Sequence, residues 1–531
     1  MSRRRIAQGI SASWVRFGVS IAVGLFQLPI LYANLSKPAL GLYLLFFTVS
    51  AFLSLVDLGL GSVLGRAVSY VKGKADAAAG EDGLAGYRSA SISDMVWSGF
   101  AAYGISSLVM FGVGLGIGPA LIASAGLPAG LQAEAWLAWV LFLAGVSCNL
   151  LSAVPFSCLN GFGDVGWEQA SRTVLQVVRL AGIAAIAPQT HSIAALCALD
   201  LALNVASIAG SLLLLKLRHR QALSEPGRAR GWLMKRMVTE ATPVFVTRLG
   251  ALMILETTPL VVAATRGVAS VPDFMALKQL SSFGLALPNA IPVAVAPFAT
   301  AAFSAGDHQK VREYHGFATR LSLVLAMLWL VGFLVWAPSL TDFWLGKGHF
   351  LGYAVAAPLA IAALLEAHHS AHGYFAWSTG KWPFAPWAIA GGVLTLGFSI
   401  AGGHVLGLGG IALGGLLAQL FTNNWYTIYY TLRRLDLRVS DYLRHSLAPV
   451  LLQGILLACV AAGSAHWLGG AWASGWSLRG VEGGKLVSML LGGFTTTLVC
   501  GLTSWHLILT ANERQLLRTA LLRGRPTEAR S

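Results

Sequence analysis

The residues with the most obvious chemical potential in this chain are a few charged side chains inside long apolar stretches. Four are cations and three are acids: Arg16, Arg179, Arg248, Lys278, Asp200, Glu256 and Glu366. An ionisable group at membrane depth costs at least ~2.5 kcal/mol, so it is retained mainly where it faces a cavity or a partner. In a water-filled cavity, arginine and lysine would hold a phosphate group by charge-assisted hydrogen bonds. We therefore treat the four cations as candidate binding residues for an anionic substrate.

Two of these cations have an alternative to substrate binding. Their side chains could extend to the membrane–water interface, that of Arg16 to the inner interface and that of Lys278 to the outer one. The three acids are candidates for ion coupling or for charge pairing. Glu256 follows Arg248 by about two helical turns, so the two share roughly one face of a helix. This spacing favours pairing with a cavity arginine, with binding of a coupling proton or sodium ion as the alternative.

A cluster of histidines follows Glu366. His368 and His372 lie four residues apart and would share a helix face, as the ligands of a zinc site do. A zinc-protease motif has its glutamate directly after the first histidine, and that order is absent here. Structural polar packing is the favoured interpretation, with a titrating group or a contact to a sugar as the alternative. We expect no metal and no other cofactor.

The elements that position these residues are predicted to be membrane-spanning helices. Only 11% of the 531 residues are charged and 56% are apolar, and apolar stretches longer than about 18 residues recur along the chain. We predict an all-α polytopic membrane protein with about fourteen transmembrane helices, two of them close together at 384–403 and 406–432. The five cysteines all fall within apolar stretches, which excludes an extracellular disulfide framework.

The net charge of +15 reflects topology. Most of the 37 Lys and Arg residues fall in short loops on one side of the predicted spans. The positive-inside rule then places both termini in the cytoplasm. Because the basic residues are spread over these loops, a nucleic-acid partner is not expected, and membrane lipids are.

The longest loop on the cytoplasmic side divides the chain. We predict an N-terminal six-helix lobe at 1–216, a basic cytoplasmic linker at 217–240, a C-terminal six-helix lobe at 241–432, two extra transmembrane helices at 433–510 and a basic cytoplasmic tail at 511–531. Six is an even number, so the second lobe starts on the same side as the first. This favours repeats related by a pseudo-twofold axis along the membrane normal.

Three short segments resemble a known family at the expected places. They are Asp57-Leu-Gly-Leu-Gly61 with Arg66, Ser304-Ala-Gly-Asp307 with Lys310, and Phe343-Trp-Leu-Gly346. Together they resemble the bacterial polysaccharide (O-antigen type) flippases of the multidrug, oligosaccharidyl-lipid and polysaccharide exporter superfamily, while the two extra helices are more similar to the arrangement in lipid II flippases.

The resemblance implies two six-helix lobes around a central cavity and transport by alternating access. It also implies a substrate, an oligosaccharide linked to a polyprenyl diphosphate, moved across the bacterial cytoplasmic (inner) membrane for surface polysaccharide biosynthesis. Other membrane proteins of that biosynthesis would be possible partners.

Two other functions remain as alternatives. An ion-coupled multidrug exporter of the same superfamily would favour acids over cations in its cavity. A polytopic enzyme acting on lipid-linked sugars would need a large outer loop, and no predicted outer loop exceeds about 20 residues. We expect a transporter and not an enzyme. No nucleotide-binding glycine loop occurs, which favours a secondary transporter coupled to a proton or sodium gradient.

Overall fold

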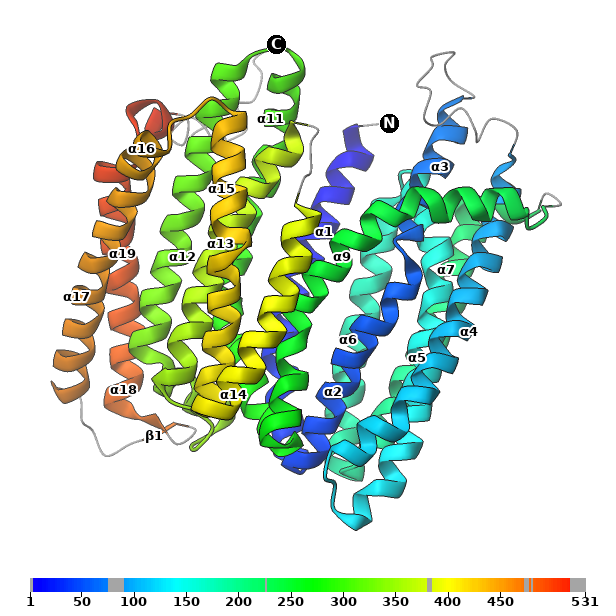
Figure 1. Ribbon diagram of the computed structural model, residues 1–531, viewed down its shortest axis with the longest axis horizontal. Helices are drawn as coiled ribbons and strands as arrows, with labels where there is room; N and C mark the ends of the chain where they lie inside the picture. The colour runs from blue at the N-terminus through cyan, green and yellow to red at the C-terminus, as the bar shows by residue number, and fades with distance from the viewer. Residues whose placement is uncertain are drawn as a thin grey trace, which may run out of the picture. The chain divides into compact units, whose positions relative to one another are not determined.

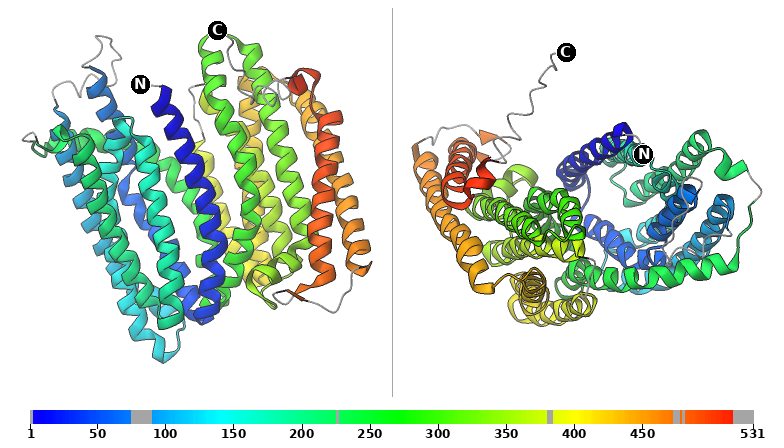
Figure 2. Two further views of the ribbon diagram at one scale, coloured as in Figure 1. Left: turned by 180° about the vertical axis from the view of Figure 1, so that it is seen from behind. Right: turned by 90° about the horizontal axis from the view of Figure 1, so that it is seen from above.

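The computed structural model describes residues 3–74, 90–224, 227–379, 384–471, 477–478 and 481–515, and almost all of them are helical (Figure 1). The chain forms two compact units, Met1–Pro272 and Asp273–Ser531. In each unit, long helices lie side by side as a bundle (Figure 2). Of the predicted cytoplasmic tail, residues 516–531 lie outside the described part of the chain.

The first unit consists of long helices joined by short connections. Its elements are α1 (Arg3–Asn34), α2 (Lys37–Leu53), η1 (Ser54–Asp57), α3 (Leu60–Lys74), α4 (Ile92–Ser124), α5 (Ala129–Gly161), α6 (Val165–Thr190), α7 (Ile193–Arg218), α8 (Gln221–Ser224), α9 (Gly231–Arg266) and η3 (Val268–Ser270).

The second unit has the same helical character. Its elements are α10 (Val271–Ser282), η4 (Phe283–Leu285), α11 (Ala286–Ser304), α12 (His308–Leu345), α13 (Tyr353–Ser378), α14 (Ala385–Phe421), α15 (Asn423–Arg434), α16 (Val439–Tyr442), η5 (Leu443–Leu447), α17 (Ala448–Ala471), β1 (Ser477–Leu478), β2 (Val481–Glu482), α18 (Gly483–Val487), η6 (Ser488–Gly492), α19 (Gly493–Thr503) and η7 (Ser504–Ile508).

Within the described residues, thirteen helical segments are long and apolar enough to cross a membrane. One of them, Ala385–Arg434, reverses direction at Gly407, whose φ of 67° and ψ of −145° are not helical. The hydroxyl of Ser399 donates to the carbonyl of Ile411 over 3.1 Å, although residues twelve apart on a straight helix are about 18 Å apart. This segment therefore makes two passes, so the described residues contain fourteen candidate spans, which confirms the predicted all-α polytopic fold.

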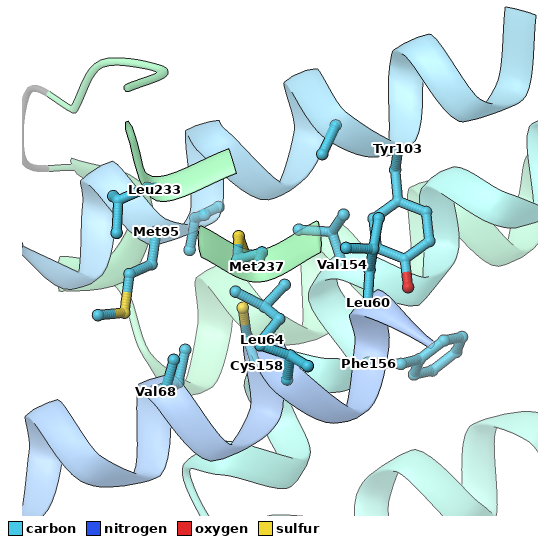
Figure 3. Close-up of a cluster of buried hydrophobic side chains, with 14 of the residues drawn as sticks. Leu60, Leu64, Val68, Met95, Tyr103, Val154, Phe156, Cys158, Leu233 and Met237 are labelled. Carbon is cyan, nitrogen blue, oxygen red and sulfur yellow. The ribbon is translucent and has the colours of Figure 1, made fainter. Parts of the chain in front are cut away.

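Helix α9 packs with the first unit. It contacts α2, α3 and α4, so the division between the compact units falls after Pro272, beyond the linker predicted at 217–240. Its first turns supply Leu233 and Met237 to a buried cluster that also contains Leu64 of α3 and Cys158 of α5 (Figure 3). Most of the predicted linker therefore has helical structure, and its apolar side chains belong to a core.

Glycine permits one unusually close approach in this unit. A Cβ atom on Gly41 of α2 would lie 2.1 Å from the carbonyl oxygen of Val268 in η3. Backbone atoms cannot move aside as the end of a flexible side chain can. The contact between α2 and the end of α9 thus depends on the missing side chain at position 41.

A cluster of charged residues closes the end of the same bundle. Asp164, in the turn between α5 and α6, accepts hydrogen bonds from Arg218 Nε (2.7 Å) and Nη2 (3.1 Å) at the end of α7, and is 2.8 Å from Nε2 of His219. Burial acts to raise the pKa of the Asp164 carboxyl, but the hydrogen bonds from Arg218 and His219 outweigh it, so the pKa is lowered. The cluster ties the α5–α6 turn to α7.

The two C-terminal spans are packed against α12. Leu323, Met327 and Trp336 of α12 share a buried cluster with Leu457 of α17 and Cys500 of α19. A short antiparallel hairpin of β1 and β2 lies between the two spans in sequence. The two extra helices predicted from sequence are therefore integral parts of the second unit.

Candidate functional site

A line of polar contacts joins α1 to α6 in the first unit. Nη1 of Arg16 donates to Oε1 of Gln169 (2.7 Å), and the hydroxyl of Ser20 donates to Oε1 of Gln176 (3.1 Å). Farther along, Gln27 of α1 also contacts α6. The three α1 residues are four and seven residues apart, so they lie on one face of the helix. Both helices contain a candidate membrane span, and hydrogen bonds of this kind hold membrane helices together.

The third contact of this line belongs to a larger group, which we call the four-helix network. It contains Gln27 of α1, Tyr43 of α2, Arg179 of α6 and Asp200 of α7. Arg179 donates to Asp200 through Nε (2.6 Å) and Nη2 (3.2 Å), to Oε1 of Gln27 through Nη1 (2.9 Å) and to the hydroxyl of Tyr43 through Nη2 (3.0 Å). The Tyr43 hydroxyl donates in turn to Asp200 (3.0 Å).

The network leaves Arg179 little capacity for another ligand. Four of its five N–H groups are used by the hydrogen bonds just described. Its side chain is 23% exposed and that of Asp200 only 8%, so the pair lies largely inside the unit. Of the two roles predicted for Asp200, the geometry corresponds to charge pairing.

Arg248 of α9 has a more open environment. Its Nη1 is 3.2 Å from Oδ2 of Asp57, and its Nη2 donates to the hydroxyl of Ser54 over 3.3 Å. The Arg248 side chain remains 42% exposed. The partner of Arg248 is thus Asp57 in η1, and not Glu256, which lies farther along α9. No ion pair of Glu256 appears among the described residues.

Arg16 and Arg248 lie at one level of the first unit. Two residues join α1 to α2, so the helices run in opposite directions. Arg16 precedes Gln27 by eleven residues on α1. Ser54, the first residue of η1, follows Tyr43 of α2 by eleven residues, and each separation corresponds to about 16 Å along the helix axis. Both displacements point the same way from the four-helix network. The structure therefore places these two arginines at a common depth and the arginine of the network elsewhere.

The remaining predicted site residues lie in the second unit. Lys278 is half-buried on α10, where its carbonyl accepts hydrogen bonds from Ser281 and Ser282. Glu366 is half-buried on α13 and accepts a hydrogen bond from Ser370 (3.3 Å). Lys278 and Glu366 belong to the second unit, whereas Arg16 and Arg248 form their contacts within the first.

Sequence reasoning missed the neutral partners of these cations. Gln27, Gln169 and Tyr43 complete the contacts of Arg16 and Arg179, and all three lie within apolar spans. Glutamine at membrane depth is itself a detectable signal, because an unpaired amide there is costly. His368 and His372 on α13 are buried in a polar cluster, and no group of three or more potential metal ligands suited to an ion occurs among the described residues.

The chain is similar to the structure of the lipid II flippase MurJ in an inward closed conformation, with a TM-score of 0.67 and 13% identity over 97% of this chain and 99% of that one. It is also similar to a multidrug resistance MATE family transporter in an inward-facing conformation, with a TM-score of 0.64 and 15% identity over 78% of this chain and 94% of that one.

At these identities the likeness is one of fold. No family model matches the sequence, and no curated protein does. The comparisons support a multi-pass membrane protein with the fold of a transporter. The substrate must be argued from the residues of the site.

Proposed function

We propose that this protein is a flippase that moves a polyprenyl-diphosphate-linked oligosaccharide across the bacterial cytoplasmic membrane by alternating access. The observation that carries the proposal is the position of Arg16 and Arg248 at one level of the first unit. Both belong to predicted membrane spans, and both retain hydrogen-bonding capacity for a ligand.

The charges at this level favour an anionic ligand. Arg16 donates a hydrogen bond to the neutral amide of Gln169, and the acid near it, Glu168, is already paired with Arg172 at 3.0 Å, so Arg16 has no ion-pair partner of its own among the described residues. Asp57 approaches one nitrogen of Arg248, and the arginine side chain is 42% exposed. Guanidinium groups bind phosphate oxygens in pairs of parallel hydrogen bonds, so a diphosphate headgroup suits two such groups.

The likeness of fold fits this proposal. One similar structure is that of a lipid II flippase, and this chain and that one align over nearly their whole lengths, including the two C-terminal spans. The MATE transporter aligns with 78% of this chain. A hydrophobic-cation exporter would require acids where this unit presents Arg16 and Arg248.

The orientation and the other partners are part of the proposal. The excess of Lys and Arg in loops on one side would place both termini in the cytoplasm. Other membrane proteins of surface polysaccharide biosynthesis would supply the lipid-linked glycan and receive it after transport.

The test is flipping of a labelled polyprenyl-diphosphate oligosaccharide in proteoliposomes. We expect Arg16→Gln and Arg248→Gln each to lower the rate by roughly 10- to 100-fold, because a hydrogen bond to a charged group contributes ~1.5–3 kcal/mol. Arg248→Gln would be combined with Asp57→Asn, so that no unpaired carboxylate remains. The charge-preserving Arg248→Lys should retain more activity than Arg248→Gln.

A matched control is available on the same helix. Arg236 of α9 pairs with Glu240 at 2.9 Å, outside the apolar span that begins at Phe245, and its change to glutamine should leave the rate unchanged. Wild-type protein that ignores the lipid and moves organic cations would instead support the exporter alternative.

A further inference from the structure

Four buried side chains of the second unit form an unbroken chain of hydrogen bonds. Nε2 of His315 on α12 is 3.1 Å from Nδ1 of His372 on α13, and Nε2 of His372 is 3.2 Å from the hydroxyl of Tyr442 on α16. That hydroxyl is 2.5 Å from Nε2 of His368, one turn before His372 on α13. The exposed fraction of each residue is 7% or less. We call these residues the His–Tyr chain.

The chemistry of imidazole allows two arrangements of the protons. In the first, His315 Nε2–H donates to His372, His372 Nε2–H donates to the oxygen of Tyr442, and the Tyr442 hydroxyl donates to His368. In the second, every donor and acceptor is exchanged. A neutral imidazole carries one proton, so a ring whose Nε2 accepts is protonated on Nδ1. The heavy-atom positions satisfy both arrangements equally.

Conversion of one arrangement into the other moves a proton. When His315 takes up a proton at Nδ1, it passes its Nε2 proton to His372, which passes its own to Tyr442. Tyr442 passes its hydroxyl proton to His368, and His368 releases the proton on its Nδ1. One proton enters, one leaves, each ring ends neutral, and no covalent bond other than N–H and O–H changes.

We propose that the His–Tyr chain is a proton pathway in the second unit. If the transport function proposed above is correct, the proton is then the coupling ion. A merely structural cluster would need each ring held in one arrangement by a neighbouring donor or acceptor of fixed direction. The carbonyl of His372 receives such a bond, from Thr431 (3.1 Å), but that bond does not fix the ring.

The charged groups around the His–Tyr chain permit a proton to enter it. The nearest cation is Arg320, one turn and a little beyond His315 on α12. It forms an ion pair with Glu513, with side-chain exposures of 13% and 11%, so its charge is largely cancelled. Arg320 also donates to Ser446 in η5 (3.4 Å). Among the described residues, Glu513 is thus the acid that lies beside Arg320, near the His315 end of the His–Tyr chain.

The other titratable neighbours lie on α13, α16 and η5. His369 follows His368 directly, and its Nδ1 is buried without a hydrogen-bond partner in the described part of the chain. An imidazole nitrogen of this kind would accept a proton released next to it. Glu366, Asp441 and His445 are all more exposed than the four members of the chain, and the ring of His445 is bound to the carbonyl of Asp441.

Tyr442→Phe is the decisive variant, because it removes the hydroxyl and preserves the ring. In proteoliposomes at zero membrane potential, we expect a pH difference of one unit to change the ratio of inward to outward lipid flipping by up to tenfold in the wild type, and not at all in Tyr442→Phe. His315→Gln, which interrupts the His–Tyr chain at its first member, should have the same effect. Tyr430→Phe is the matched control, since the ring of Tyr430 packs against Phe384 and Tyr426 and is not a member of the His–Tyr chain.

A second measurement requires no transported lipid. Solid-state NMR of the full-length protein in bilayers, labelled with ¹⁵N-histidine, reports which ring nitrogen carries the proton. We expect both tautomers of His368 and His372 in the wild type, exchanging together, and a single fixed tautomer of His368 in Tyr442→Phe. Identical tautomer populations in the two proteins would refute the pathway. Absence of lipid flipping in every protein would count against the proposed transport function, while the NMR comparison would still decide the pathway.

Discussion

Changing Asp200 to asparagine removes the charge that compensates Arg179 and leaves a guanidinium group inside the first unit without a counter-ion. Asp200 accepts two hydrogen bonds from Arg179 and one from Tyr43, and its side chain is 8% exposed. Removing one partner of a buried ion pair typically costs ~3–5 kcal/mol. With about 2 °C or more per kcal/mol for a unit of this size, the melting temperature should fall by at least about 6 °C.

Replacing both partners should cost much less. In Arg179→Met with Asp200→Leu no buried charge is left, and we expect a residual loss of about 1–2 kcal/mol from the hydroxyl of Tyr43 and the amide of Gln27, which lose their partners. Thermal unfolding in detergent, followed by tryptophan fluorescence, would be measured for the wild type, Arg179→Met, Asp200→Leu and the double variant, which together form one thermodynamic cycle.

The same double variant separates two roles of Arg179. If its guanidinium serves the four-helix network, the well-folded double variant should flip labelled lipid at nearly the wild-type rate. A double variant that is as unstable as Asp200→Asn would refute the energetic argument. A stable double variant that has lost flipping would show that Arg179 binds substrate, as the sequence analysis proposed.

Two further predictions concern packing and pH. Gly41→Ala should destabilise the first unit by roughly 2 kcal/mol or more, because its Cβ would overlap the carbonyl of Val268, whereas Gly104→Ala, with open space around it, should be neutral or slightly stabilising in the same thermal assay. Asp164→Asn should lower the melting temperature at pH 7, and equal melting temperatures there would contradict the reasoning. Since the pKa of Asp164 is lowered by folding, its contribution is fully present above the unfolded pKa of about 3.9 and is lost as pH falls through the lower, folded value. The difference in melting temperature between variant and wild type should therefore begin to shrink below about pH 4 and vanish below the folded pKa.

The number of spans could be predicted from sequence, because the length of an apolar stretch is fixed by membrane thickness. Gly407 illustrates this: the predicted break between the spans 384–403 and 406–432 falls within a few residues of Gly407, where α14 reverses. The boundary of the compact units could not be predicted in the same way. It depends on contacts of α9 with α2, α3 and α4, such as the approach of Gly41 to Val268, and no local pattern encodes a contact between residues so far apart in sequence.

The candidate site shows a similar division. Arg16, Arg179 and Arg248 stand out in the sequence because they lie in apolar stretches. A cation at membrane depth has a free-energy cost, so each of them is expected to have a structural or binding role. The apolar surroundings do not show which of these cations already has an ion-pair partner within the protein. The partner of Arg179 is on the next helix, and the partner of Arg248 is in a turn nearly two hundred residues earlier.

The degree of compensation is what separates structural cations from ligand-binding ones. Arg179 is bound by a carboxylate that two of its nitrogens share, so a substrate phosphate would have to displace a counter-ion already in place. Arg16 is held by a neutral amide, which orients the guanidinium without cancelling its charge. A phosphate that reached Arg16 would gain a full charge interaction and would break no ion pair. Selection of an anionic headgroup is therefore expected to depend more on Arg16 and Arg248 than on the buried arginine of the four-helix network.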